Sequence, residues 1–153
     1  MESICCYDSP VGTLRIAEDG TGITEITLVK SVEETPAQQK TELLKETVRQ
    51  LEEYFAGSRK GFDLPLSLKG TPFQLSVWEA LQTIPYGSTC SYQQIAAQVG
   101  SPKACRAVGM ANHYNPVIIV VPCHRVIGKN GAMVGFGGGI DVKERLLGLE
   151  HEG

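Results

Sequence analysis

A cysteine, a histidine and an arginine are consecutive in VVPCHRVIG, residues 120 to 128. A free cysteine has a pKa of about 8.5, so little of it is thiolate at neutral pH, and a nearby imidazole or cation lowers that pKa. Cys123 has such neighbours in His124 and Arg125. The sequence therefore predicts a nucleophilic thiol at Cys123, with a buried and inert thiol as the alternative.

The position of His124 limits how it could act on Cys123. Adjacent residues of an extended strand point to opposite faces, so proton transfer requires a bridging water or a turn, which Pro122 favours. A cysteine hydrolase normally takes its histidine from a distant part of the sequence and needs an oxyanion hole. Of the other histidines, His113 falls in a predicted helix and His151 lies near the end of the sequence. A cysteine hydrolase is therefore the second interpretation.

No cofactor and no metal are predicted beside the thiol. The glycine-rich GFGGG, residues 135–139, follows no strand typical of a dinucleotide-binding unit, and no acidic residue stands about twenty residues later to bind a ribose. The five cysteines include no C-x-x-C pair and lack zinc-ligand spacing. The atom that the thiol attacks must therefore arrive on a bound macromolecule.

The composition predicts a globular protein of a reducing compartment. The 153 residues are 42% apolar, and the N-terminus has neither a basic leader nor an apolar segment. No apolar run approaches the length of a membrane span, and the cysteine count is odd. We therefore expect a cytoplasmic protein without a membrane partner; a monomer is expected as well.

Charge is distributed unevenly along the chain. The net charge is -3, yet no acidic residue occurs between Glu79 and Asp141. That stretch contains four lysines and arginines, at Lys103, Arg106, Arg125 and Lys129. Because an anionic partner responds to the local field, this segment can bind nucleic acid although the whole chain is acidic.

The first part of the sequence predicts a sheet and a helix. Residues 3 to 29 alternate in three short strands with turns at Ser9-Pro10 and Asp19-Gly20. A helix cap follows at Thr35-Pro36 with Gln38, and an apolar stripe then places Leu44, Val48, Leu51 and Phe55 toward the core. Residues 57 to 70 have the composition of a connector, so we expect domains at 1–69 and 70–153.

The second part predicts several short helices. Capping boxes at Thr71 with Gln74 and at Ser91 with Gln94 each begin a helix, and Ser101-Pro102 begins another that Asn115-Pro116 ends. Two short helices around Gly100 are typical of a helix-turn-helix, although ordinary packed helices look the same. The apolar VIIVV, residues 117–121, predicts a buried strand that leads into Cys123. A last helix runs to about His151.

Three motifs together carry a family resemblance. PCHRVIG, preceded by RAVGMANHYNP and by YGSTCSYQQIA, resembles the O6-alkylguanine-DNA alkyltransferases, or methylated-DNA–protein-cysteine methyltransferases. The resemblance covers about residues 71 to 152, and the first part matches in layout only. It implies an α/β protein with a small ribonuclease-H-like sheet-plus-helix domain, then a mostly helical, winged helix-turn-helix-like domain.

The resemblance implies a single-turnover repair reaction without a cofactor. Cys123 would take the alkyl group from O6 of guanine, and we expect O4-methylthymine as a further substrate. By position, His124 matches a base that acts through water, and Glu150 the carboxylate that orients it. Tyr92 matches a tyrosine that assists the leaving guanine.

The resemblance also implies binding to double-stranded DNA that carries alkylated bases. Arg106 matches an arginine that fills the gap left by the extruded base, and Asn115 matches an asparagine that holds the cysteine loop. Further DNA contacts are expected from Tyr92, Ser101 and Lys103.

The expected base pocket departs from the family pattern. Phe136 and Gly137 stand where the family often has a tyrosine and a serine, so backbone N–H groups there, with Gly138, would have to contact the base. A non-catalytic sensor of alkyl lesions remains the alternative on the same scaffold. Retention of Cys123 argues against it, because the sensor relatives lack that cysteine.

Overall fold

Two compact units make up the protein, residues 1–68 and 69–153. The computed structural model describes residues 2–29, 41–128 and 140–152. Among these residues, no helix is long and apolar enough to cross a membrane. The two units are described separately below.

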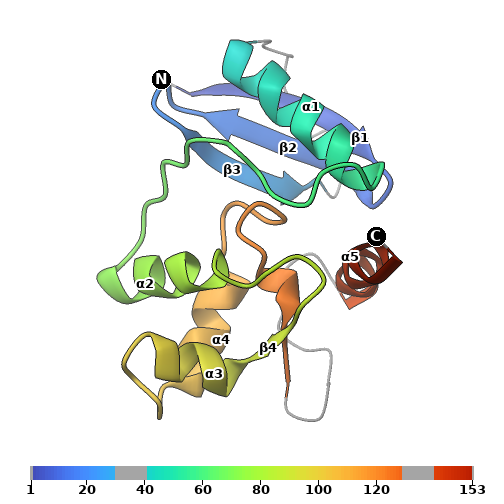
Figure 1. Ribbon diagram of the computed structural model, residues 1–153. Helices are drawn as coiled ribbons and strands as arrows, with labels where there is room; N and C mark the ends of the chain where they lie inside the picture. Colours follow the sequence, from blue (N-terminus) through green and yellow to red (C-terminus); the bar gives the residue numbers. More distant parts are fainter. Residues whose placement is uncertain (1, 30–40, 129–139, 153) are drawn as a thin grey trace. The chain divides into compact units, whose positions relative to one another are not determined.

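The first unit is a three-stranded sheet with one helix on it (Figure 1). Strands β1 (Ser3–Ser9), β2 (Gly12–Glu18) and β3 (Ile23–Leu28) are antiparallel in the order β1-β2-β3. Helix α1 (Glu42–Phe55) packs on β1 and β2. The three strands predicted from the alternating pattern are therefore confirmed.

Helix α1 begins later than predicted. Its N-cap is Thr41, whose side chain accepts a hydrogen bond from the Leu44 backbone N–H. Thr35, Pro36 and Gln38, the predicted cap, lie outside the described residues. The buried face includes Leu44 and Leu51 as predicted.

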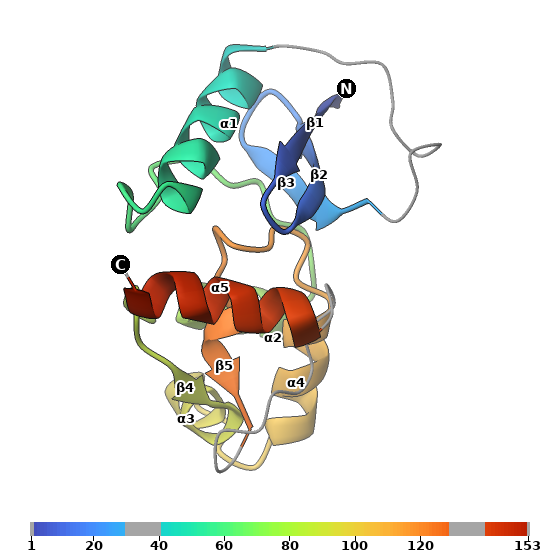
Figure 2. The same ribbon diagram turned by 90° about the vertical axis from the view of Figure 1, so that its right-hand side faces the viewer.

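The described residues of the second unit form short helices and one small parallel strand pair. Its elements are α2 (Pro72–Leu81), β4 (Cys90–Ser91), α3 (Tyr92–Gln98), α4 (Cys105–His113), the 3-10 helix η2 (Cys123–Arg125), β5 (Val126–Ile127) and α5 (Ile140–Glu152). Strands β4 and β5 pair in parallel. Helix α5 packs against η2, as Figure 2 shows. The turn η2 thus packs against the C-terminal helix and leads directly into β5.

Both predicted capping boxes of this unit are present. The Thr71 hydroxyl accepts from the Gln74 backbone N–H, and the Gln74 side chain accepts from the Thr71 N–H; Ser91 and Gln94 do the same at α3. Each box satisfies backbone donors that a helix start leaves unpaired. These local interactions fix where α2 and α3 begin.

The predicted start of the next helix is wrong. Ser101 and Pro102 belong to a turn, and α4 begins at Cys105, with Ala104 as an N-cap that forms no side-chain hydrogen bond. The Ser101 N–H instead donates to the Ala96 carbonyl, and the Ala104 N–H to the Ser101 carbonyl. Residues 101–104 therefore close the turn between α3 and α4.

The predicted strand at residues 117–121 is also wrong. This apolar segment is buried, but it folds into tight turns: the Val120 N–H donates to the Ile118 carbonyl at 2.8 Å and the Val121 N–H to the Val117 carbonyl at 3.1 Å. Ile119 has φ 73°, a left-handed conformation that costs a β-branched residue about 1–3 kcal/mol. Burial of Ile119, which is 1% exposed, offsets that strain.

Candidate active site

Cys123 opens the 3-10 turn η2 and is 1% exposed. The chain enters it through Pro122, at φ -80° and ψ 64°, and the Cys123 N–H donates to the Val121 carbonyl at 2.8 Å. The Arg125 N–H donates back to the Pro122 carbonyl at 3.0 Å. The chain therefore turns at the thiol, and the rule that neighbouring strand residues face opposite ways does not apply to Cys123 and His124.

Asn115 holds the segment that leads to the thiol. Its side-chain Nδ2 donates to the Val121 carbonyl at 2.8 Å, and its Oδ1 accepts from the Val117 N–H at 3.0 Å. Its side chain also hydrogen-bonds the Cys123 sulfur, which lowers the pKa of that thiol. One buried amide thus closes the loop at both ends by pairing with the Val117 N–H and the Val121 carbonyl, which are buried backbone groups that need hydrogen-bond partners.

His124 and Arg125 share one buried carboxylate, that of Glu150 on α5. The His124 Nε2 lies 2.6 Å from Glu150 Oε2, and the Arg125 Nε donates to Glu150 Oε1 at 2.8 Å. A second guanidinium nitrogen of Arg125 donates to Glu150 Oε2 at 3.0 Å, and a third donates to the Ile84 carbonyl at 2.7 Å. His124 and Glu150 are 0% and 3% exposed. The contacts of Glu150 with His124 and Arg125 anchor α5 to η2.

Burial determines the protonation states of the Cys123 thiol and the His124 imidazole. Desolvation raises the pKa of Cys123 to about 11, although the hydrogen bond from Asn115 and the charge of Lys143 partly oppose it. Burial also lowers the pKa of His124, against the opposing effect of Glu150. At neutral pH the imidazole is therefore neutral and the isolated thiol is protonated.

The tautomer of His124 follows from its contacts. A carboxylate accepts hydrogen bonds, so we assign the ring proton to Nε2, facing Glu150. The Nδ1 atom is buried and makes no hydrogen bond within the described part of the chain. Nδ1 is therefore the nitrogen able to accept a proton.

Lys143 adds a positive charge near the thiol. It is 0% exposed, and its Nζ donates to the Val126 carbonyl on β5. Burial lowers its pKa, whereas the charge of a Cys123 thiolate would raise it. A thiolate at Cys123 is thus stabilised by Lys143.

Tyr92 lies within electrostatic reach of the thiol, at the start of α3. Burial raises the pKa of Tyr92, and the negative charge of a Cys123 thiolate raises it further. The Asn112 side chain hydrogen-bonds the Tyr92 oxygen and lowers that pKa. Asn112 was not among the predicted site residues, although a polar residue on the apolar face shared by Val108 and Ala111 is a signal for it.

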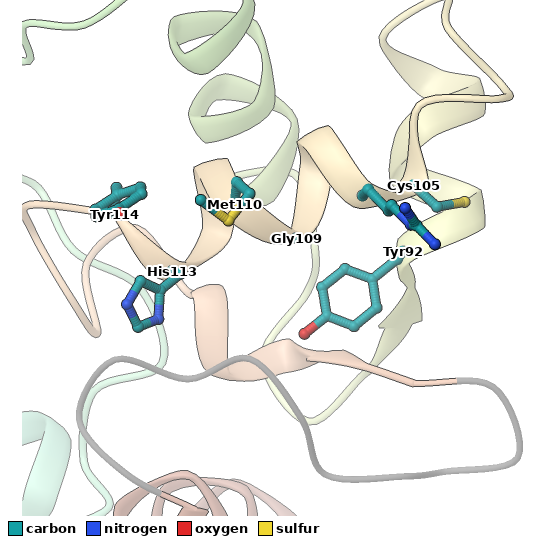
Figure 3. A pocket seen from close by; sticks show the side chains of 7 residues that line it. Tyr92, Cys105, Gly109, Met110, His113 and Tyr114 are labelled. Carbon is teal, nitrogen blue, oxygen red and sulfur yellow. The ribbon is translucent and has the colours of Figure 1, made fainter.

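Helices α3 and α4 form an open surface beside this site. A cavity of about 700 Å³ is lined by Tyr92, Cys105, Arg106, Gly109, Met110, His113 and Tyr114 (Figure 3). Arg106 and Lys103 are exposed and Ser101 is half-buried, so the structure leaves all three accessible. Cys123, His124 and Glu150, in contrast, are buried.

The remaining predictions concern the base pocket and metal binding. Phe136, Gly137 and Gly138, the predicted base pocket, lie outside the described residues. Within residues 2–29, 41–128 and 140–152, no group of three or more histidine, cysteine, aspartate or glutamate side chains is arranged to hold a metal ion.

Comparison with known proteins matches both units. A family model described as 6-O-methylguanine DNA methyltransferase, DNA binding domain, matches residues 72–152, and one described as its ribonuclease-like domain matches residues 5–68. A methylated-DNA–protein-cysteine methyltransferase of Methanosarcina acetivorans is 49% identical over 148 residues, covering 94% of this chain and 95% of the relative. The constitutive one of Bacillus subtilis is 51% identical over 152 residues, covering 94% and 92%.

A solved structure shows the same similarity. The crystal structure of Mycobacterium tuberculosis OGT in complex with DNA is 47% identical, with a TM-score of 0.90. The match covers 98% of this chain and 93% of that chain.

Proposed function

Since the chain belongs to the 6-O-methylguanine DNA methyltransferase family, we propose that Cys123 is the cysteine that receives the alkyl group. The protein repairs DNA by transferring an alkyl group from the damaged DNA to a cysteine, as its methyltransferase relatives are named for doing. The family and the fold class expected from the motifs are confirmed.

The observation that supports Cys123 is the buried histidine–carboxylate pair at its side. Of the five cysteines, Cys5 and Cys6 belong to the sheet of the first unit, Cys90 to β4 and Cys105 to α4. Cys123 alone adjoins His124, with its 2.6 Å contact to Glu150. A thiol needs a base to become a nucleophile, and this base is neutral, oriented and adjacent.

The proton leaves Cys123 through His124. With Nε2–H directed at Glu150, the Nδ1 atom accepts the thiol proton through a bridging water, and Glu150 stabilises the imidazolium that forms. Lys143 and the amide of Asn115 stabilise the thiolate. They only partly oppose the desolvation that raises the pKa of Cys123 to about 11, so the thiol needs His124 as a base.

The substrate and the side chains supply every bond and proton that the transfer needs, so no cofactor takes part. The sulfur attacks the alkyl carbon, a carbon–sulfur bond forms, and the bond between that carbon and O6 of guanine breaks. The electron pair passes to the guanine, which takes a proton from the Tyr92 hydroxyl, and the histidine proton returns to the tyrosine through water. The products are guanine and an S-alkylcysteine, and a thioether is not reversed, so each molecule acts once. The same step removes the methyl group of O4-methylthymine.

The partner of the protein is DNA. We propose that a monomer binds duplexes with alkylated bases through the α3–turn–α4 surface, where Ser101, Lys103 and Arg106 are accessible. A base inside a duplex cannot reach a buried thiol, so the base must be extruded, at a cost of a few kcal/mol. Arg106 compensates part of this cost by occupying the gap.

Arg106→Ala is expected to lower transfer from duplex DNA by roughly tenfold or more, because unstacking costs a few kcal/mol per step. Transfer from the free base O6-methylguanine should be unchanged, because a free base needs no extrusion. Single-turnover rate constants for the two substrates measure this. Arg145→Ala, which removes another exposed arginine, on α5, is the matched control. Equal losses with both substrates would contradict this role of Arg106.

Transfer should be constant from neutral pH down past about 6.5, the usual His pKa, and fall only at lower pH, because the pKa of His124 is lowered and only neutral imidazole accepts a proton. The free energy of unfolding should fall from about pH 6.5 downward, since the unfolded chain binds a proton more readily than the buried His124 does. Rate constants measured from about pH 5 to 10 test this, a range that includes the ordinary pKa values of histidine and cysteine. A rate that climbs steadily toward pH 10 would show direct ionisation of the thiol instead.

The proposed function is tested by mass spectrometry of the intact protein and its peptides. The protein is mixed with a duplex that carries one O6-methylguanine. We expect a stoichiometric gain of one methyl group, confined to the Cys123 peptide. Binding of the lesion duplex without methyl transfer would instead indicate a lesion sensor.

A further inference from the structure

Asn112 is a fully buried polar side chain on α4 that contacts two other elements. It is 0% exposed. Its Nδ2 donates to the main-chain carbonyl of Cys123 at 3.4 Å. Its side chain also hydrogen-bonds the oxygen of Tyr92, on α3. One amide therefore links the turn that carries the thiol to Tyr92.

Packing alone does not explain an amide at this position. The neighbours of Asn112 on the buried face of α4, Val108 and Ala111, are apolar, and burying an amide costs free energy unless it is hydrogen-bonded. Helix α4 is already fixed to α2 by the Trp78 indole N–H, which donates to the Ala111 carbonyl at 2.8 Å. The amide thus supplies hydrogen bonds rather than helix anchoring.

The direction of these hydrogen bonds determines where the Tyr92 proton points. A side-chain amide has two N–H donors, so Asn112 can donate to the Cys123 carbonyl and to the Tyr92 oxygen at once. Donation to that oxygen favours ionised tyrosine and lowers the pKa of Tyr92. It also directs the hydroxyl proton away from Asn112. In Figure 3 the Tyr92 ring lies beside Gly109, with its hydroxyl pointing away from Cys105.

We propose that Asn112 is a positioning residue for proton delivery: it fixes the Tyr92 hydroxyl relative to the Cys123 turn so that Tyr92 donates to the leaving base. This inference rests on the proposed function. Asn112 touches neither the alkyl group nor the base, and acts through Tyr92. Its effect should therefore appear in the rate of transfer and not in the affinity for DNA.

A double-mutant cycle separates this role from packing. Asn112→Leu keeps approximate size and removes both hydrogen bonds, and Tyr92→Phe removes the hydroxyl. We expect Asn112→Leu to slow single-turnover transfer roughly tenfold, the effect of about one hydrogen bond to a reacting group. In the Tyr92→Phe background the same change should alter the rate by less than about twofold, because the hydroxyl that Asn112 positions is gone. Equal effects in both backgrounds would overturn the proposal.

A spectroscopic measurement tests the same link without activity. In protein labelled with ¹³C at the tyrosine ζ carbon, the signal missing from Tyr92→Phe identifies Tyr92. Its pKa should rise in Asn112→Leu, because the hydrogen bond that lowers it is lost. An unchanged Tyr92 titration would overturn the proposal. Asn112→Ser, smaller and polar, serves both measurements if Asn112→Leu does not fold.

Gln50→Leu is the control for loss of a buried amide. Gln50 lies on α1 in the first unit, is 2% exposed, and exchanges hydrogen bonds with the Asp63 backbone at 2.9 and 3.1 Å. Its replacement should lower stability without changing the transfer rate or the Tyr92 titration. If the unmodified protein transfers no methyl group, the proposed function fails; if it does and Asn112→Leu transfers equally fast, only the role of Asn112 fails.

Discussion

Replacement of Cys123 by serine should abolish alkyl transfer, lowering the single-turnover rate constant by more than about a thousandfold. A serine hydroxyl is far less acidic than a thiol, so the His124–Glu150 pair cannot generate a comparable nucleophile from it. The change is small in volume, so folding and binding of a lesion duplex should persist. Peptide mass spectrometry after reaction with an O6-methylguanine duplex, with a parallel binding assay, measures both.

Cys5→Ser is the matched control for this experiment. Cys5 is also a buried cysteine, at 5% exposure, but it belongs to β1 in the first unit. The Cys5→Ser variant exchanges a buried sulfur atom for oxygen, as Cys123→Ser does, and should leave transfer intact. Methylation of another cysteine in Cys123→Ser at the original rate would assign the acceptor elsewhere.

The sequence predicted elements well where their signals are local. The capping boxes at Thr71 and Ser91 bring two side chains of one turn together, and both are present. The pattern Ser101-Pro102 also resembles a helix start, although Ala104 stands where a capping box has Gln or Glu. There, however, the Ser101 N–H donates to the Ala96 carbonyl of the preceding helix, and this interaction gives a turn instead. The end of α3, closed by this hydrogen bond and by Gly100 at φ 81°, therefore takes up the residues that the local pattern assigns to the start of the next helix.

The apolar segment 117–121 also shows that a local sequence pattern does not determine the backbone conformation. Its composition indicates burial correctly, but burial does not specify a strand. The Asn115 side chain satisfies the Val117 and Val121 backbone groups that a neighbouring strand would otherwise pair. No periodicity reveals that the side chain of an asparagine outside the segment pairs with these backbone groups.

The spacing of residues in the sequence was not enough to predict the whole site. Cys123 and His124 stand out as neighbours, whereas Glu150 follows His124 by 26 positions and was assigned only through the resemblance to a known family. The structure places its carboxylate 2.6 Å from the imidazole, which the residues alone could not establish. Asn112 was missed because its partners, on α3 and η2, meet only in the folded chain.

Glu150→Gln should lower both stability and transfer. The change leaves the buried Arg125 guanidinium without its carboxylate, which typically costs about 3–5 kcal/mol. His124 loses the group that raises its pKa and stabilises its protonated form, so it becomes a weaker base. We expect the transfer rate to fall by about 10² to 10⁴. Urea unfolding and single-turnover transfer measure the two effects.

A double variant, Arg125→Met with Glu150→Gln, separates these two roles of Glu150. Removing the unpaired charge should restore much of the stability, because a buried ion pair can often be replaced by uncharged side chains. Recovery should be incomplete, since the Ile84 carbonyl loses its donor from Arg125. The transfer rate should stay low, because His124 still lacks its carboxylate. If transfer returns together with stability, Glu150 contributes to catalysis only by holding α5 against η2, and His124 acts without its help.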